Sequence, residues 1–340
     1  MNQYLSNIFE QPLELKHVLD TLIDDEYSSV MAVAEKLNEY ENITLTSMGS
    51  ALNSLMPMYY ALLARHKSVL LIESSELLDS PGLIRPNSLY IIMSRSGESY
   101  EVAKLPELLN EKGVVSIGIS MTPESTMAKG VSILLYDHSS YDALLCTKAY
   151  TSMALCGMVC VHAMDKIPDK NALKPIYDFF DWLEENKETI LKAVAEIPFP
   201  NSPLSFYLLS RSYGMGVVRS ASLWLEEGAK ICANVSSIDT FYHGPIELCR
   251  TQCIFVYLDA RSNERSKMIW DKICSYSGNT IYFGPDESNA AYNVTTPQFD
   301  LDEGYIMLML AMYFQLLTYH CALAGGIEPG EMENVSWVIE

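Results

Sequence analysis

Short runs of apolar residues alternate along the chain with longer stretches in which apolar residues recur every three or four positions. Five such runs occupy the first half: Ile43–Ser47, Val69–Glu73, Ser88–Ser94, Val114–Ser120 and Val131–Tyr136. This alternation is typical of parallel strands buried between two layers of helices. The first half is therefore expected to form a mostly parallel sheet. Helices are expected at about residues 28–40, 51–65, 98–111 and 143–164.

The alternation stops in a charged stretch and then restarts. The later runs are Leu204–Leu209, Val235–Asp239, Cys253–Leu258 and Thr280–Phe283. Helices are expected beside them, at Gly214–Ile231, Glu264–Tyr276 and 303–324. Because the two halves repeat one pattern, we predict an α/β fold with two lobes. Each lobe is expected to be a mostly parallel sheet flanked by helices, in a three-layer, flavodoxin-like arrangement.

These patterns divide the chain into five expected segments. They are an N-terminal helical segment (1–28), a first lobe (29–165), a helical connector (166–200), a second lobe (201–326) and a C-terminal tail (327–340).

Composition and charge narrow the range of partners. Of the 340 residues, 49 % are hydrophobic and 19 % are charged, which is enough apolar material for a full core. The formal net charge is −20. Such a surface repels nucleic acids and anionic membranes, so neither is an expected partner. An anionic ligand needs local donors that work against this field.

The sequence also predicts a cytoplasmic protein. The N-terminus lacks the basic start and apolar stretch of a secretory signal, and none of the eight cysteines forms a C-x-x-C pair. Free, mostly buried thiols are expected. Tyr305–Ala324 is long enough to cross a bilayer, but it contains Gln315 and His320, so a helix buried in the core is the better interpretation.

The turn after the third apolar run carries the strongest chemical signal. It contains Ser94, Arg95, Ser96, Gly97 and Ser99 and leads directly into a helix. At the carboxyl edge of a parallel sheet, helix N-termini direct N–H groups at anions. The turn lacks the patterns of nucleotide and dinucleotide loops, so it predicts a site for a single phosphoryl group. The alternative is an ordinary helix cap made by Ser96.

Two other turns have similar chemistry. Gly49 and Ser50 follow the first apolar run, and Thr147 and Lys148 stand at the start of the helix expected at 143–164. Lys148 has an alternative interpretation as a solvated surface charge. Because carboxyl ends of parallel strands meet at one edge of a sheet, we expect these turns to converge.

The same motifs occur in the same order in a known family. The turn Ser94–Ser99 resembles the phosphate loop of SIS-domain (sugar isomerase) phosphosugar proteins. The chain is most similar to the isomerase half of glucosamine-6-phosphate synthase and to fructosamine-6-phosphate deglycases. The resemblance covers residues 30–340, without a glutaminase domain. Its further matching segments are Gly49-Ser50, Thr147-Lys148-Ala149, Phe241–Pro245, Leu317–His320 and Ser336–Glu340.

The resemblance also implies two catalytic residues. In both relatives a glutamate precedes the histidine of His-Gly-Pro by sixteen positions, and here sixteen positions before His243 is Glu227. Glu227 resembles the base that moves a proton between C1 and C2. His243 resembles the residue that opens the sugar ring or protonates a heteroatom, and in the family it can come from the neighbouring subunit. The alternatives are that Glu226 is the base, that both glutamates are solvated, and that His243 is only a turn residue.

Departures from the family pattern affect the expected substrate. Val335 stands where the synthase has a lysine in its C-terminal tail, and Trp224 stands where it has a lysine one turn before the catalytic glutamate. Arg95 replaces a glutamine and Ala51 a serine. The loss of the two lysines argues against glucosamine-6-phosphate synthesis. Trp224 is a candidate contact for the amine side of a bulkier substrate.

The function that the resemblance implies is a fructosamine-6-phosphate deglycase, which converts a glycated amino acid 6-phosphate and water into glucose 6-phosphate and the amino acid. The enzymatic alternatives are an aldose–ketose phosphosugar isomerase and an amino-sugar-phosphate isomerase or deaminase. A non-catalytic sugar-phosphate sensor is the alternative of another class. No metal or organic cofactor is expected. The protein is expected to form a homodimer or higher homo-oligomer with shared active sites. The identity of the amine stays open.

Overall fold

The computed structural model describes residues 2–142, 145–199, 205–332 and 334. Within these ranges the chain divides into two compact units. The first unit contains residues 10–142, 146–184 and 334, and the second unit contains residues 2–9, 145, 185–199 and 205–332. Each unit is described by itself below. The domain boundaries expected from the sequence stay predictions.

The first unit is built on a five-stranded sheet in which every pair of neighbours is parallel. Its order is β2-β1-β3-β4-β5, so the direction of winding reverses between β1 and β3. The strands are β1 (Asn42–Ser47), β2 (Ser68–Glu73), β3 (Ser88–Ser94), β4 (Ser116–Ser120) and β5 (Ile133–Tyr136). β3 is buried at every position, as expected for the middle strand of a covered sheet.

The second unit repeats this topology. Its sheet is also parallel, in the order β10-β9-β8-β6-β7. Counted from its first strand this is again 2-1-3-4-5, the flavodoxin-like order. The strands are β6 (Phe206–Ser210), β7 (Ala233–Ser237), β8 (Ile254–Leu258), β9 (Thr280–Gly284) and β10 (Tyr292–Thr295). The prediction of two parallel α/β lobes is confirmed.

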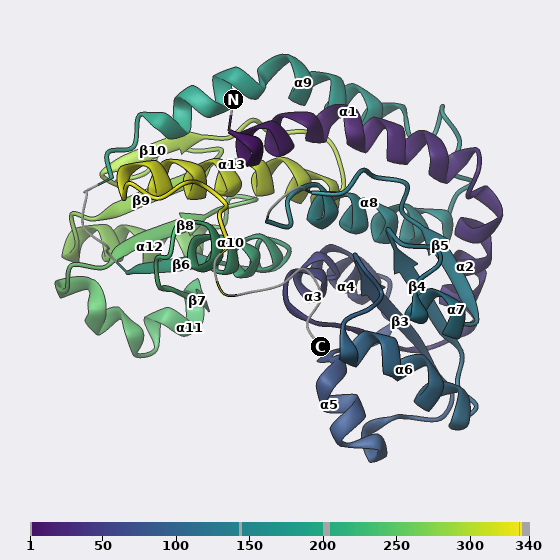
Figure 1. Ribbon diagram of the computed structural model, residues 1–340. Coiled ribbons are helices and arrows are strands. Elements are labelled where there is room, and N and C mark those ends of the chain that lie inside the picture. Colours follow the sequence, from purple (N-terminus) through teal and green to yellow (C-terminus); the bar gives the residue numbers. More distant parts are fainter. Residues whose placement is uncertain (1, 143–144, 200–204, 333, 335–340) are drawn as a thin grey trace. The chain divides into compact units, whose positions relative to one another are not determined.

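Helices cover both faces of each sheet (Figure 1). In the first unit α2, α4 and α8 pack together in one layer, and α5, α6 and α7 pack together in another; in the second unit α10 packs on α13, and α11 packs on α12. The α-helices are α1 (Gln3–Ile23), α2 (Tyr27–Glu39), α3 (Gly49–Ser54), α4 (Met56–Ala64), α5 (Ser74–Asp79), α6 (Tyr100–Glu111), α7 (Thr126–Gly130), α8 (Lys148–Ala163), α9 (Lys174–Ala195), α10 (Gly214–Gly228), α11 (Ile238–Tyr242), α12 (Glu264–Tyr276) and α13 (Glu303–Ala324). The 3-10 helices are η1 (Pro81–Leu83) and η2 (Pro245–Arg250).

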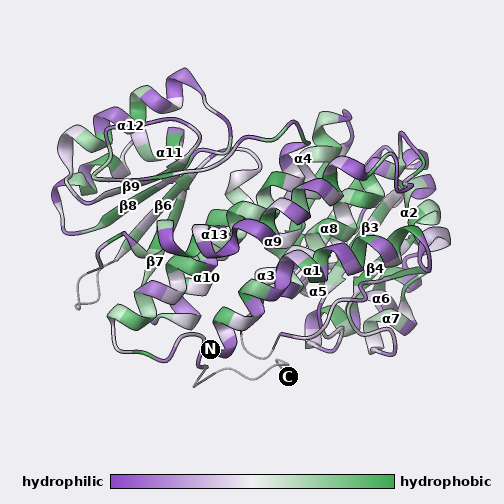
Figure 2. Ribbon diagram, turned by 90° about the horizontal axis from the view of Figure 1, so that it is seen from above, coloured by the Kyte–Doolittle hydropathy of each residue, from purple (hydrophilic) through white to green (hydrophobic). Residues whose placement is uncertain are grey.

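Buried apolar side chains form the core of each unit. Central strands such as β3 and β8 are mainly hydrophobic in Figure 2. α13 has the length and composition of a membrane span, but 83 % of its most apolar window is buried inside the protein. It is therefore a core helix, as the sequence predicted. In the second unit one buried cluster joins β8 to α12 and includes Phe255, Tyr257 and Trp270.

Removal of Trp270 tests this core. The side chain is fully buried against Tyr257 and Tyr282, with ring centroids 5.4 and 6.5 Å away. We expect Trp270→Ala to lower the free energy of unfolding by about 3–5 kcal/mol, because it leaves a cavity. Met268 lies on the same helix and is 60 % exposed, so Met268→Ala is the control and should change it by less than about 0.5 kcal/mol. Equal effects in urea denaturation would contradict this packing.

Candidate active site

The turns after β1 and β3 lie beside each other at the point where the sheet of the first unit reverses its winding. Thr46 of β1 is paired with Ile92 of β3, and the next residue, Ser47, donates a short hydrogen bond to the carbonyl of Met93. Crossovers leave these two strands toward opposite faces, so their turns diverge and leave a crevice for ligands. The residues Gly49, Ser50 and Ser94–Ser99 are thereby brought to one place.

The turn after β3 is ordered by its own serines. The hydroxyl of Ser94 accepts a hydrogen bond from the N–H of Gly97 at 3.0 Å, and that of Ser96 accepts one from Glu98 at 3.2 Å. α6 begins at Tyr100, two residues later than predicted, and Ser99 holds the N-cap position without a side-chain capping bond. The alternative that Ser96 caps the helix is therefore wrong. Ser96 and Ser99 are both partly exposed.

Gly97 fits this turn because it has no side chain. Its φ of +64° lies in the left-handed region, and a Cβ atom would stand 2.1 Å from the hydroxyl of Ser125. Its carbonyl accepts a hydrogen bond from Met127, and the carboxylate of Glu98 accepts two from Thr126 at 2.8 Å each. Hydrogen bonds from the start of α7 thus stabilise the conformation of the turn.

The turn after β1 also has left-handed backbone, since Gly49 has φ +54°. The next residue, Ser50, has a buried hydroxyl that makes no hydrogen bond within the described part of the chain. A buried hydroxyl without a partner costs free energy, so a ligand oxygen at this position would satisfy it.

A carboxylate that the sequence analysis did not single out organises the third turn. Asp142 accepts hydrogen bonds from the backbone N–H of Thr147, Lys148 and Ala149 at 2.8–3.0 Å and from the hydroxyl of Thr147 at 2.6 Å. Burial raises the pKa of this carboxyl, and the positive charge of Arg95 opposes part of the rise. The N-terminus of α8 is therefore capped from within the protein.

Lys148 has partners of its own. Its ammonium donates to the carboxylate of Glu10 at 2.8 Å and to the hydroxyl of Ser140 at 2.9 Å, and its side chain is only 5 % exposed. The alternative of a solvated surface charge is therefore wrong. Because an ammonium carries three N–H donors, these two partners leave one donor for a phosphoryl group.

In the second unit Glu227 is the next-to-last residue of α10. Its side chain is half-buried, whereas Glu226 is exposed and accepts a 3.4 Å hydrogen bond from the backbone N–H of Ala233. Lys230, which has φ +55°, donates to the carbonyls of Glu227 at 2.6 Å and Glu331 at 2.5 Å. The end of the Glu227 helix is thus tied to the segment that leads into the C-terminal tail.

Glu227 and His243 lie toward opposite edges of the second sheet. α10 starts beyond the carboxyl end of β6 and returns along the sheet, so Glu227 lies near the edge where β7 begins. His243 is exposed and follows α11, which starts where β7 ends. A strand of five residues, about 15 Å long, separates these two edges.

No family model matches the chain. Its sequence is similar to two isomerizing glutamine–fructose-6-phosphate aminotransferases. That of Methanococcus maripaludis is 24 % identical over 330 residues, covering 94 % of this chain and 53 % of the relative. That of Pyrobaculum aerophilum is 23 % identical over 345 residues, covering 98 % and 56 %. The chain thus spans about half the length of the curated relatives it matches.

Solved structures share the fold at low sequence identity. The C-terminal domain of glucosamine-fructose-6-phosphate aminotransferase from Francisella tularensis superposes with a TM-score of 0.81 at 16 % identity, covering 97 % of this chain and 98 % of that one. Glucosamine-6-phosphate deaminase from Thermotoga maritima superposes with a TM-score of 0.79 at 17 % identity, covering 99 % of each chain. Tagatose-6-phosphate ketose/aldose isomerase from Escherichia coli superposes with a TM-score of 0.78 at 18 % identity, covering 98 % of this chain and 97 % of that one. The resemblance to SIS-domain phosphosugar proteins is confirmed.

Two positions at which the chain departs from the synthase pattern have different outcomes. Trp224 is fully buried, so a contact with the amine side of a substrate would require the ring to be uncovered, and that contact stays a prediction. Val335 lies outside the described residues, as do residues 333 and 336–340 of the predicted C-terminal tail.

The Gly97 turn is tested by comparison with a second left-handed glycine. We expect Gly97→Ala to lower the free energy of unfolding by about 2–4 kcal/mol, since it adds the clash with Ser125 to left-handed strain. Gly113 has φ +67° and open space around its Cβ position, so Gly113→Ala is the control and should cost only about 1 kcal/mol. Equal losses in urea denaturation would show that the clash is relieved without cost.

Proposed function

We propose that this protein is a fructosamine-6-phosphate deglycase of the SIS type, a cytoplasmic enzyme that hydrolyses a glycated amino acid 6-phosphate to glucose 6-phosphate and the amino acid. The observation that carries the proposal is the serine-rich turn at the β1/β3 switch point of the first unit, together with the half-buried Glu227 at the end of α10. The relatives named above are enzymes of phosphorylated sugars, which supports the general class.

The phosphoryl group is proposed to bind at the first switch point. Ser50 offers its unpartnered hydroxyl, and Ser96 and Ser99 offer partly exposed ones. The N-terminus of α6, whose cap position carries no side-chain bond, adds backbone donors and a positive dipole. These local donors are needed because the protein carries a formal charge of −20.

Glu227 is proposed to act as the base. It takes a proton from C1, next to the C2 carbonyl, while the carbonyl oxygen accepts a proton, giving an enaminol. Return of a proton to C2 and loss of the N–H proton give the imine of glucose 6-phosphate, in which the C2 hydroxyl is kept, and water then hydrolyses the C1=N bond. The substrate's own carbonyl acidifies the C1 proton, and the amine nitrogen gives up its proton as the C1=N bond forms. His243 is proposed to carry the proton on oxygen.

A shared active site follows if these two residues work together. Within one chain they lie toward opposite edges of one sheet, as described above. A histidine from a neighbouring subunit removes this obstacle, so we propose a homodimer in which each site combines Glu227 of one subunit with the partner's copy of the His-Gly-Pro segment. The loss of the synthase lysines at Trp224 and Val335 favours the deglycase over the synthase.

Product analysis tests the reaction. Purified protein is incubated with a panel of 6-phosphorylated fructosamines that carry different amino acids, and with amino sugar phosphates and ketose phosphates. Release of glucose 6-phosphate and free amino acid supports the deglycase and identifies the amine. Turnover of only an amino sugar phosphate or a ketose phosphate contradicts it in favour of a deaminase or an isomerase. Saturable binding without any turnover contradicts it in favour of a sensor.

Substitution of the two adjacent glutamates tests the base. We expect Glu227→Gln to lower kcat by about 10²–10⁴-fold, because the amide cannot accept the C1 proton. Glu226→Gln removes the same charge one residue earlier at an exposed position, and it should leave kcat within about twofold. Steady-state kinetics with the substrate found above measures both. The reverse order of effects would assign the base to Glu226.

Mixed dimers test the shared site. Glu227→Gln and His243→Ala chains are each expected to be inactive alone. When the two are co-expressed in equal amounts, half of the dimers are mixed, and each mixed dimer has one site with both native residues. Activity should therefore recover to about a quarter of the wild-type value. No recovery in mixed dimers isolated with two affinity tags would show that both residues act from the same chain.

A further inference from the structure

The second unit has a switch point of its own that the proposed reaction does not use. It lies between β6 and β8, which are neighbours in the second sheet as β1 and β3 are in the first. The hydroxyl of Ser210, at the end of β6, donates to the carbonyl of Leu258 at 2.8 Å. This bond is the counterpart of the one from Ser47 to Met93, so the two crevices are built on the same frame.

The turn after β6 repeats the left-handed backbone of the turn after β1. Gly49 stands two residues beyond the end of β1, and Ser212 stands two residues beyond the end of β6 with φ +49°. A serine in this conformation costs on the order of 1 kcal/mol, whereas glycine does not. Strain of this kind is commonest where a turn is held in shape for a ligand.

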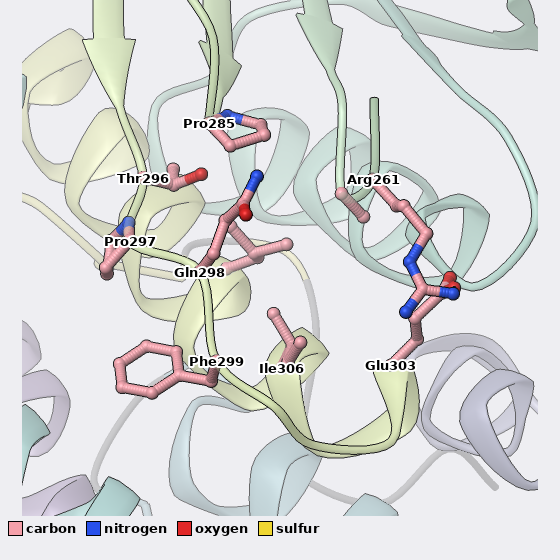
Figure 3. Close-up of a pocket in the computed structure, with 10 residues that line it drawn as sticks. Arg261, Pro285, Thr296, Pro297, Gln298, Phe299, Glu303 and Ile306 are labelled. Atoms are coloured by element: carbon pink, nitrogen blue, oxygen red, sulfur yellow. The ribbon is translucent and has the colours of Figure 1, made fainter. Parts of the chain in front are cut away.

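A hollow opens between the two turns of the second unit. It measures about 160 Å³ and is lined by Arg211, Ser212, Arg261, Ser262, Asn263 and Glu303. A second hollow of about 110 Å³ shares Arg261 and Glu303 with it and extends toward the segment after β10. Figure 3 shows this second hollow, with Arg261 beside Glu303 on one side and Thr296 and Gln298 on the other. Both are smaller than the pockets that hold drug-sized ligands, which favours a small one.

Two arginines line this hollow, although the protein as a whole is strongly acidic. The guanidinium of Arg211 is exposed and makes no hydrogen bond or ion pair in the described ranges of the chain, and its charge opposes part of the rise in the pKa of the Asp259 carboxyl. Arg261 pairs with the carboxylate of Glu303 at 3.0 Å. Because a guanidinium carries five N–H donors, this single pair leaves donors for a ligand.

The acidic groups around the hollow oppose an anion only in part. Asp286 accepts a 2.6 Å hydrogen bond from Ser262. Asp259, directly after β8, is buried and accepts one from Tyr282 at 3.1 Å; burial raises the pKa of its carboxyl. The carboxylate that lines the hollow itself is Glu303.

We propose that this hollow is a second binding site for a small phosphomonoester, in which Arg211 and Arg261 clamp the phosphoryl group and Asn263 and Ser212 border it. Arginine forks match phosphate oxygens in geometry and charge. Glu227 lies at the opposite end of α10 from the turn that carries Arg211, near the edge of the sheet where β7 begins, so this hollow is separate from the proposed base. The proposal does not depend on the deglycase reaction.

Titration calorimetry with inorganic phosphate, and separately with glucose 6-phosphate, tests the proposal on the full chain. We expect the double variant Arg211→Gln/Arg261→Gln to weaken one phosphate-binding component about tenfold or more, since it removes the charge-assisted hydrogen bonds. Arg250→Gln/Arg265→Gln removes the same charge from exposed positions of the same unit outside the hollow, and it should leave that component unchanged. Glu303→Gln removes the opposing carboxylate and should tighten it severalfold.

A variant of the first unit separates this site from the substrate site. Ser96→Ala/Ser99→Ala should leave the arginine-dependent component in place, whether or not it abolishes turnover. The proposal is overturned if this variant removes all saturable phosphate binding, or if both arginine pairs weaken binding equally. Thermal melting of each variant ensures that only folded protein is compared. A stronger response to glucose 6-phosphate than to phosphate identifies a sugar body as part of the ligand.

Discussion

The reversal of winding between two neighbouring parallel strands determines where this protein can bind ligands. β1 and β3 are paired in register, yet the chain leaves them toward opposite faces of the sheet. No helix can cover both turns at once, so backbone N–H groups and short polar side chains remain accessible between them. The hydrogen bond from Ser47 to Met93 joins the ends of the two strands. The phosphate site that we propose at the following turn depends on this frame.

The same constraint occurs twice, and the chain has filled it with different side chains. In the first unit the crevice carries hydroxyls and two left-handed glycines, Gly49 and Gly97. In the second unit a left-handed serine and two arginines take that place. The turn of the first unit also contains Arg95, so the second unit differs in having two arginines at one hollow, since hydroxyls and amides hold a phosphoryl group less strongly. Arginine forks hold it more tightly and suit a ligand that stays bound.

Much of the fold follows from the sequence because buried strands and amphipathic helices are locally encoded. β3 and α12 have the bounds that the apolar pattern predicted, Ser88–Ser94 and Glu264–Tyr276. β10 was missed because it is a short edge strand in which only Val294 is buried, so it has no apolar run. Interactions between distant residues were also missed. Lys148 pairs with Glu10, which lies 138 positions away, and no local pattern can report such a contact.

The candidate site was predictable to the extent that its chemistry is local. The turn Ser94–Ser99 combines strand, glycine and hydroxyls within a few residues, and the structure brings it beside Gly49 and Ser50 through strand pairing alone. Asp142 escaped notice because its role depends on a turn that folds back over the start of α8.

The Asp142 cap also has a consequence for the site. It already satisfies the N-terminus of α8, whereas α3 and α6 begin in the two turns of the switch point without a side-chain cap and are the helix starts that the proposed phosphoryl group would meet.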